Sequence, residues 1–138
     1  MKRTKLSRNS KLPIAKLKRE ADKWLSLWVR KNGSKRGMNE CYTCRVWYLV
    51  EKLQCSHFFS RVHSATRFHP DNVRPACFAC NVWRRGNIAA YSIRLQEEIG
   101  FERIKELERL SKSIFKLTPQ YLQGIIDTYK SKYDNTQL

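Results

Sequence analysis

The sequence predicts an α+β fold that is mainly helical, with a zinc-stabilised central region between an N-terminal helix and C-terminal helices. Three observations support this prediction. Apolar residues recur at helical spacing near both ends of the chain. Two runs rich in β-formers lie in the middle. Two Cys-x-x-Cys pairs flank these runs at the spacing of zinc ligands.

The N-terminal helix is expected within residues 13–33. Pro13 suits the first turn of a helix, and Asn32-Gly33 marks its end. Between them the apolar residues follow a helical period: Ile14, Leu17, Ala21, Trp24, Leu25 and Trp28. Residues 1–12 precede this pattern and are expected to form a flexible basic arm.

The two β-rich runs, residues 46–50 and 53–59, predict a hairpin that turns near Glu51-Lys52. Residues 60–75 show no clear period and are expected to be a loop. The core of the domain is therefore assigned to residues 38–100.

Four further helices are expected. One begins at the second Cys pair and ends near residue 85, and another runs from an Asn87 cap to Glu98. Ile104, Leu107 and Leu110 mark the next, and Thr118-Pro119 caps the last. Residues 101–138 complete a single domain that spans residues 13–138.

The charge of the chain points to a polyanion. Lys and Arg number 28 against 12 acidic residues, a net charge of +16, and the first nineteen residues hold eight basic residues and no acid. Nucleic acid is the preferred partner, because cations that neutralise phosphates release counterions. The alternatives are a solubility tail or attraction to anionic lipid. Basic candidates near the N-terminus are Lys2, Arg3, Lys5, Arg8, Lys11, Lys16, Lys18 and Arg19.

The sequence predicts neither a secreted nor a membrane-spanning protein. The basic N-terminus has no apolar stretch of the kind found in secretory signals. No apolar run approaches the length needed to cross a bilayer. We therefore expect a cytoplasmic protein without a membrane partner.

The cysteines predict one structural zinc ion. Four thiolates complete a tetrahedral site, so such a site is closed to substrate. The ligands are Cys41, Cys44, Cys77 and Cys80, whereas Cys55 is expected to be a buried apolar residue. His57, His63, His69 and Asn81 are then free for other work.

The segment CSHFFSRVHSATRFHPDNVRPACFACN, residues 55–81, resembles the HNH, or ββα-metal, nucleases. The resemblance is closer to the phage NinG/Rap recombination endonucleases, and it covers roughly residues 41–100. It implies a ββα-metal core and a structure-selective DNA endonuclease. The implied substrates are branched recombination intermediates such as Holliday junctions and D-loops, in the host cell cytoplasm.

The same resemblance implies roles for single residues. His57 would be the general base, Asn72 would brace the loop, and Asn81 would bind a catalytic Mg²⁺ or Mn²⁺. Arginines near the site could clamp phosphates in bidentate fashion; these are Arg61, Arg67, Arg74, Arg84 and Arg85. Trp47 and Trp83 are expected in the core, and His69 is expected to be structural or exposed.

The chain departs from the superfamily in its acidic residues. Ser56 and Gln54 occupy positions where related patterns have an Asp. Either Asn81 and water carry most of the coordination of the catalytic metal, or His63 or Asp71 joins it. Mg²⁺ tolerates a mostly aqueous shell, whereas a histidine ligand would favour Mn²⁺ or another transition metal.

Two other functions fit the sequence. One is a sequence-specific homing or packaging endonuclease of the HNH type. The other is a non-catalytic zinc-knuckle protein that binds nucleic acid through its charge. For an enzyme that acts on a symmetric junction, a homodimer that cuts opposed strands is favoured, and the C-terminal helices could supply its interface. The apolar stripes of these helices fit packing within one chain equally well.

Overall fold

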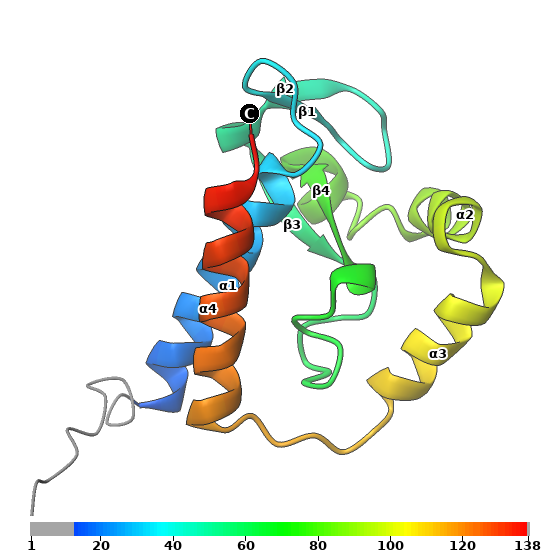
Figure 1. Cartoon of the computed structure of the whole chain (residues 1–138). Helices are drawn as coiled ribbons and strands as arrows, with labels where there is room; N and C mark the ends of the chain where they lie inside the picture. The colour runs from blue at the N-terminus through cyan, green and yellow to red at the C-terminus, as the bar shows by residue number, and fades with distance from the viewer. Residues whose placement is uncertain (1–12, 138) are drawn as a thin grey trace, which may run out of the picture.

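The computed structural model describes residues 13–137 of the chain. Helices α1 (Ile14–Lys31) and α4 (Pro119–Asn135) lie side by side along one flank (Figure 1). Strands β3 (Leu53–His57) and β4 (Val73–Cys77) form a hairpin beside them. Helices α2 (Ile88–Ile99) and α3 (Phe101–Ser111) form an arc on the other side of this hairpin. The mixed α+β class that the sequence predicts is confirmed.

Helix α1 follows the predicted stripe. Its buried residues Leu17, Ala21, Leu25 and Val29 recur every four residues and so line one face. That face packs against α4 and against Phe68 and Val73 in the largest apolar cluster. The helix starts after Pro13, which has no backbone N–H to leave unpaired. The docking of α1 therefore rests on apolar burial.

The strand pairing differs from the predicted hairpin. Strand β2 (Trp47–Leu49) pairs with β1 (Met38–Glu40), and β3 pairs with β4, which lies in the stretch expected to be a loop. A short 3₁₀ turn, Val50–Lys52, separates the two sheets. The reason lies in the cysteines, because pairing of Leu53 with Cys77 brings the second Cys pair beside the first. Val73, Ala76 and Cys77 are buried in β4 although no alternation marks it in the sequence.

A single π-helical turn, Ala79–Trp83, replaces the helix expected up to residue 85. Its backbone bonds reach five and six residues, from Arg84 N to Ala79 O and from Gly86 N to Cys80 O. Arg85 and Asn87 then take left-handed conformations, with φ of 50° and 48°. This wide turn ends early because Cys80 is buried in the cysteine cluster. Asn87 precedes α2 but makes no side-chain cap, contrary to the prediction.

The last two helices agree with the sequence pattern. Helix α3 begins directly after Gly100, whose φ of 85° suits glycine. In α4 the hydroxyl of Thr118 accepts a hydrogen bond from Tyr121 N at 3.1 Å, as the Thr-Pro pair predicts. None of the helices within residues 13–137 is long and apolar enough to span a membrane.

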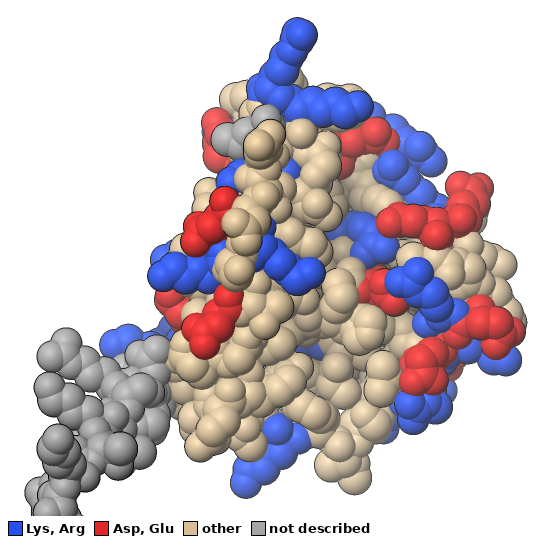
Figure 2. All heavy atoms as spheres, viewed as in Figure 1, with Lys and Arg blue, Asp and Glu red and all other residues tan. Residues whose placement is uncertain are grey.

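Five of the 12 acidic residues lie on two consecutive helices. On the face drawn in Figure 2, red side chains gather over α2 and α3. These two helices contain Glu97, Glu98, Glu102, Glu106 and Glu108.

Candidate metal centre and active-site groove

The four predicted cysteines form one cluster. The sulfur atoms of Cys41, Cys44, Cys77 and Cys80 all lie within 4.8 Å of one another, and Cys44 Sγ lies 3.9 Å from Cys77 Sγ. A tetrahedral zinc ion with Zn–S bonds of about 2.3 Å separates its sulfurs by roughly 3.8 Å. The geometry therefore fits a structural zinc ion, and Cys55 lies outside the cluster.

Neighbouring groups donate hydrogen bonds to these sulfurs. The backbone N–H of Cys80 lies 3.5 Å from Cys77 Sγ, and Arg84 Nη1 lies 3.4 Å from Cys80 Sγ. Burial disfavours the thiolate of Cys41, but hydrogen bonds with the backbone of Cys44 and Cys77 outweigh it and lower its pKa to about 6. Positive donors of this kind stabilise thiolates, the form that binds zinc. Arg84, predicted to bind DNA, instead contacts the cysteine cluster.

A groove of about 770 Å³ lies between α1, β3 and the π-helical turn. It brings together His57 and Asn81, which are 24 positions apart in the sequence. Helix α1 contributes Arg19, Asp22, Lys23, Ser26 and Arg30 to its lining, and β3 contributes Leu53, Gln54, Cys55 and His57. The loop after β3 contributes Ser60 and Arg61, and the π-helical turn and the residues after it contribute Asn81, Arg85 and Gly86. This groove is the candidate active site.

His57 ends β3 and is held by one backbone group. Its Nε2 lies 2.9 Å from the carbonyl oxygen of Arg67, so Nε2 carries the proton and donates it. Nδ1 then has a free lone pair, and within residues 13–137 it makes no hydrogen bond. Burial lowers the pKa of His57 to about 4, and the bond to Arg67 offsets only part of this effect. The imidazole is therefore neutral at pH 7 and able to accept a proton.

Asn72 is fully buried and holds both ends of the loop that follows β3. Its Oδ1 accepts from Phe59 N at 2.7 Å, and its Nδ2 donates to the carbonyls of Phe59 and Thr66 at 2.9 and 3.0 Å. Three hydrogen bonds nearly satisfy a buried amide. Asn72 does not line the groove, and these side-chain hydrogen bonds all go to the loop that follows β3.

Asn81 faces β3 across the groove. Its Nδ2 donates to Gln54 Oε1 at 2.7 Å, and Asn81 Oδ1 accepts no hydrogen bond from residues 13–137. In the sequence, Gln54 stands out only because related patterns have an Asp at this position. The sequence does not predict its contact with Asn81. This hydrogen bond restrains the Asn81 side chain in the lining of the groove.

Asp22 is the only carboxylate among the groove-lining residues. Its two oxygens accept from Arg67 at 3.1 Å (Nε) and 2.5 Å (Nη2), so it is already paired. Sequence reasoning missed Asp22, although a signal was present. Arg19, Asp22, Lys23, Ser26 and Arg30 form a polar stripe at helical spacing, opposite the buried stripe of α1.

Two residues considered as extra metal ligands do not reach the groove. Asp71 pairs with Arg103 of α3, at 2.5 and 3.2 Å, so its carboxylate is directed toward α3. His63 lies in the loop, where its backbone N–H donates to Ser60 O, and its side chain does not line the groove. The structure therefore does not support either as a ligand beside Asn81.

Arg74 makes its contacts within the chain. Its side chain is only 13% exposed, and it donates to Glu98 and to the carbonyls of Pro70 and Val73. It also stacks over the Tyr42 ring at 5.3 Å. These contacts occupy the guanidinium of Arg74 within the chain, and the structure does not test whether Arg74 binds DNA.

Five of the other predicted cations line the groove or the pocket beside it. Arg19, Arg61 and Arg85 line the groove itself. A smaller pocket of about 450 Å³ shares Ser60 and Arg61 with it and is also lined by Lys18, Val62, Ser64 and Arg67. Lys16 is exposed on α1. The predicted positions Lys2, Arg3, Lys5, Arg8 and Lys11 lie outside the described residues.

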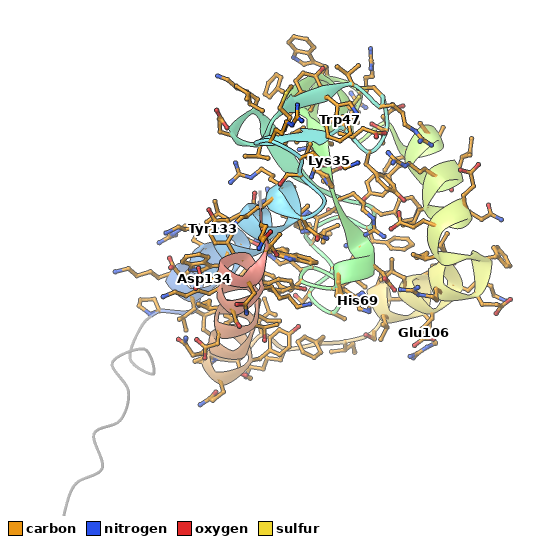
Figure 3. The ribbon with its side chains drawn as sticks, turned by 45° about the horizontal axis from the view of Figure 1, so that its top comes forward. Lys35, Trp47, His69, Glu106, Tyr133 and Asp134 are labelled. Carbon is orange, nitrogen blue, oxygen red and sulfur yellow. The ribbon has the colours of Figure 1, made fainter. Side chains whose placement is uncertain are left out.

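The remaining aromatic and histidine predictions have mixed outcomes. Trp47 and Trp83 are 42% and 76% exposed, so the expectation that they belong to the core is wrong. His69 is structural, because its Nδ1 accepts from Asp71 N at 3.1 Å at the start of a 3₁₀ turn. Figure 3 shows Trp47 and His69 at opposite ends of β4. Cys55 is only partly buried and lines the groove.

Comparison with known proteins supports the resemblance seen in the sequence. No similar chain was found among curated proteins or among solved structures. The model of one family, described as the bacteriophage lambda NinG protein, matches residues 2–137. Because this match covers nearly the whole chain, the protein belongs to the NinG family of phage recombination proteins.

Proposed function

We propose that this protein is a metal-dependent endonuclease of the ββα-metal (HNH) type that cleaves branched DNA. The observation that carries the proposal is the composition of the groove. The neutral imidazole of His57 and the amide of Asn81 line it together with several Arg and Lys side chains. In this proposal the hairpin β3–β4 and the π-helical turn after it would correspond to the two strands and the short helix of such a core. Membership of the NinG family supports a branched recombination substrate.

His57 is suited to activate water. A water molecule that attacks the phosphorus must lose a proton, and His57 Nδ1 can take it because Nε2 already carries one. The phosphorus–oxygen bond to the leaving 3′-oxygen breaks as the new bond forms. The products are then a 5′-phosphate and a 3′-hydroxyl.

The groove fits a divalent cation that keeps most of its water. Asn81 Oδ1 would hold the ion, because Asp22 is occupied by Arg67 and no other carboxylate lines the groove. Mg²⁺ commonly binds through one or two protein oxygens and retains several waters. When bound, the ion would supply positive charge to the phosphate and the leaving oxygen.

Five cations line the groove and can bind phosphate: Arg19, Lys23, Arg30, Arg61 and Arg85. The smaller pocket continues from it through Ser60 and Arg61 and adds Lys18, Arg67 and the hydroxyl of Ser64. We infer that the DNA backbone follows this continuous track. Arginine and hydroxyl donors suit phosphate oxygens and carry no base preference by themselves.

Asn81→Ala should weaken metal binding more than it affects folding. We expect the Mg²⁺ concentration for half-maximal cleavage to rise at least about 10-fold, since even partners behind a metal ligand change affinity by 10–100-fold. The measurement is single-turnover cleavage of a labelled four-way junction across Mg²⁺ and Mn²⁺ concentrations. Asn81→Asp, which keeps an oxygen at this position, is the control and should retain cleavage. An unchanged metal dependence in Asn81→Ala would remove this residue from the metal site.

Residues 2–12 should contribute non-specific electrostatic binding. They contain five basic residues and no acid. Their removal should flatten the slope of log K against log salt by up to about 4–5, at about 0.9 per phosphate contact on duplex DNA. The deletion must stop before α1, because Leu17 is buried in the α1–α4 core. A full-length variant with these five cations changed to Gln is the control for chain length, and an unchanged slope in both would make the segment a solubility tail.

A further inference from the structure

Three successive carbonyl groups in the loop after β3 accept hydrogen bonds from side chains of three different elements. The carbonyl of Thr66 accepts from Asn72 at 3.0 Å, that of Arg67 from His57 at 2.9 Å, and that of Phe68 from Tyr129 Oη at 2.6 Å. We refer to residues 66–68 as the anchor segment. Tyr129 lies on α4, so the C-terminal helix is tied directly to the segment that holds His57.

The side chain of Arg67 ties the same segment to α1. Its guanidinium donates to both oxygens of Asp22, and its Nη1 donates to the carbonyl of Arg61 at 3.1 Å. The two partners are only 14% and 22% exposed, so water screens this pair weakly. A bidentate pair fixes orientation as well as distance, which a single charge contact does not.

The two helices also dock through apolar packing that is separate from these polar contacts. Helix α1 docks through Leu17, Ala21, Leu25 and Val29, and the rings of Phe68 and Tyr129 belong to the same apolar cluster. The polar contacts of Asp22 and of the Tyr129 hydroxyl are added to that packing. Asp22 binds the side chain of Arg67, and the Tyr129 hydroxyl binds the carbonyl of Phe68, so both contacts restrain the segment whose Arg67 carbonyl holds His57.

We propose that Asp22 and Tyr129 are positioning residues, which lock the carbonyl of Arg67 against His57 Nε2 and so hold Nδ1 ready to accept a proton. The proposal rests on the proposed function of His57 as the base. An imidazole without a fixed acceptor can rotate or take the tautomer protonated at Nδ1. That tautomer has no lone pair on the side where the base is needed. The helix pair α1–α4 therefore sets the geometry of the base.

The test uses Asp22→Asn and Tyr129→Phe, which remove one charge and one hydroxyl and keep the size of each side chain. We expect the single-turnover rate at saturating junction to fall about 10–100-fold, since small displacements of a reacting group are this costly. The junction concentration for half-maximal rate should change less than about 3-fold. The matched controls are Arg103→Gln, which breaks the similar Asp71–Arg103 pair, and Tyr42→Phe, which removes a hydroxyl bonded to Glu98. Both controls should keep the wild-type rate.

A second readout does not depend on nuclease activity. Nitrogen-15 NMR of the three histidines identifies each tautomer, and the spectrum of His57→Ala assigns the signals of His57. Wild-type protein should show His57 protonated at Nε2, and both variants should show a mixture of tautomers or faster exchange of that proton. If the protein cleaves no DNA, the tautomer of His57 still tests whether Asp22 and Tyr129 position its ring. The positioning proposal and the proposed nuclease function can therefore fail independently.

Two outcomes would overturn the proposal. One is an unchanged tautomer and rate in folded Asp22→Asn and Tyr129→Phe proteins. The other is weaker binding of Mn²⁺ by Asp22→Asn, measured by electron paramagnetic resonance, with an unchanged tautomer. That second result would make Asp22 a metal ligand instead.

Discussion

Replacing His57 with alanine should lower the single-turnover rate of junction cleavage by about 10²–10⁴-fold, the usual contribution of a positioned general base. Added Mg²⁺ or Mn²⁺ should not restore the rate, because a metal ion does not replace the missing proton acceptor. His57→Ala should leave zinc content and junction affinity nearly unchanged, since the four cysteines and the groove cations do not depend on this ring. A folded His57→Ala protein with wild-type cleavage would contradict the assignment of His57 as base.

The pH profile of the wild-type protein gives an independent check. The sequence alone suggests a rate that rises through an imidazole pKa near 6.5. Burial lowers the pKa of His57 to about 4, so the neutral, base-competent form already predominates above about pH 5. Titration of His57 should therefore cause no rise in the cleavage rate near pH 6.5. The pH profiles of the wild-type protein and of His57→Ala should not differ by such a rise. Since the folded pKa lies below the unfolded value, this group also costs stability as the pH falls from about 6.5 to 4.

Cys77→Ser should abolish zinc binding and unfold the central region. Cys77 is buried and ends β4, opposite Leu53, so its sulfur joins the hairpin to the first Cys pair. Structural zinc contributes about 10–16 kcal/mol of apparent binding free energy in small zinc domains, and this energy is also folding energy. Zinc content by mass spectrometry and thermal unfolding by circular dichroism measure both effects.

Cys55→Ser is the matched control for this prediction. Cys55 lies on the same hairpin but outside the cluster, so the variant should keep one zinc ion and a nearly native unfolding temperature. Full native stability of the wild-type chain after stoichiometric removal of zinc would show that the cluster does not support the fold.

The helices and the cysteine cluster could be predicted because their signals are local or strongly spaced. Leu17, Ala21 and Leu25 repeat at helical spacing within one segment, and Thr118-Pro119 marks a helix start by its own chemistry. Strand pairing could not be predicted in the same way. The run 46–50 has β-forming residues, but its partner depends on where the cysteines bring distant segments together.

The site was only partly predictable for a similar reason. His57 and Asn81 stand out beside the Cys pairs, whereas Asp22 and Tyr129 lie on helices where a polar residue usually means a solvated face. Their contacts with residues 67 and 68 span 45 and 61 positions. The pairing of Arg74 with Glu98 of α2 could not be predicted either, because it joins residues 24 positions apart.

The most direct test of the central claim compares cleavage of a labelled four-way junction with that of linear duplex of the same sequence. Purified full-length protein with one zinc ion is incubated with each DNA, with and without Mg²⁺ or Mn²⁺. We predict metal-dependent incision near the branch point, with 5′-phosphate and 3′-hydroxyl ends and much slower cleavage of the duplex. Equal, sequence-specific cleavage of both DNAs would favour a homing or packaging endonuclease. Tight binding without cleavage under every metal condition would contradict the account and leave a zinc-stabilised nucleic-acid-binding protein.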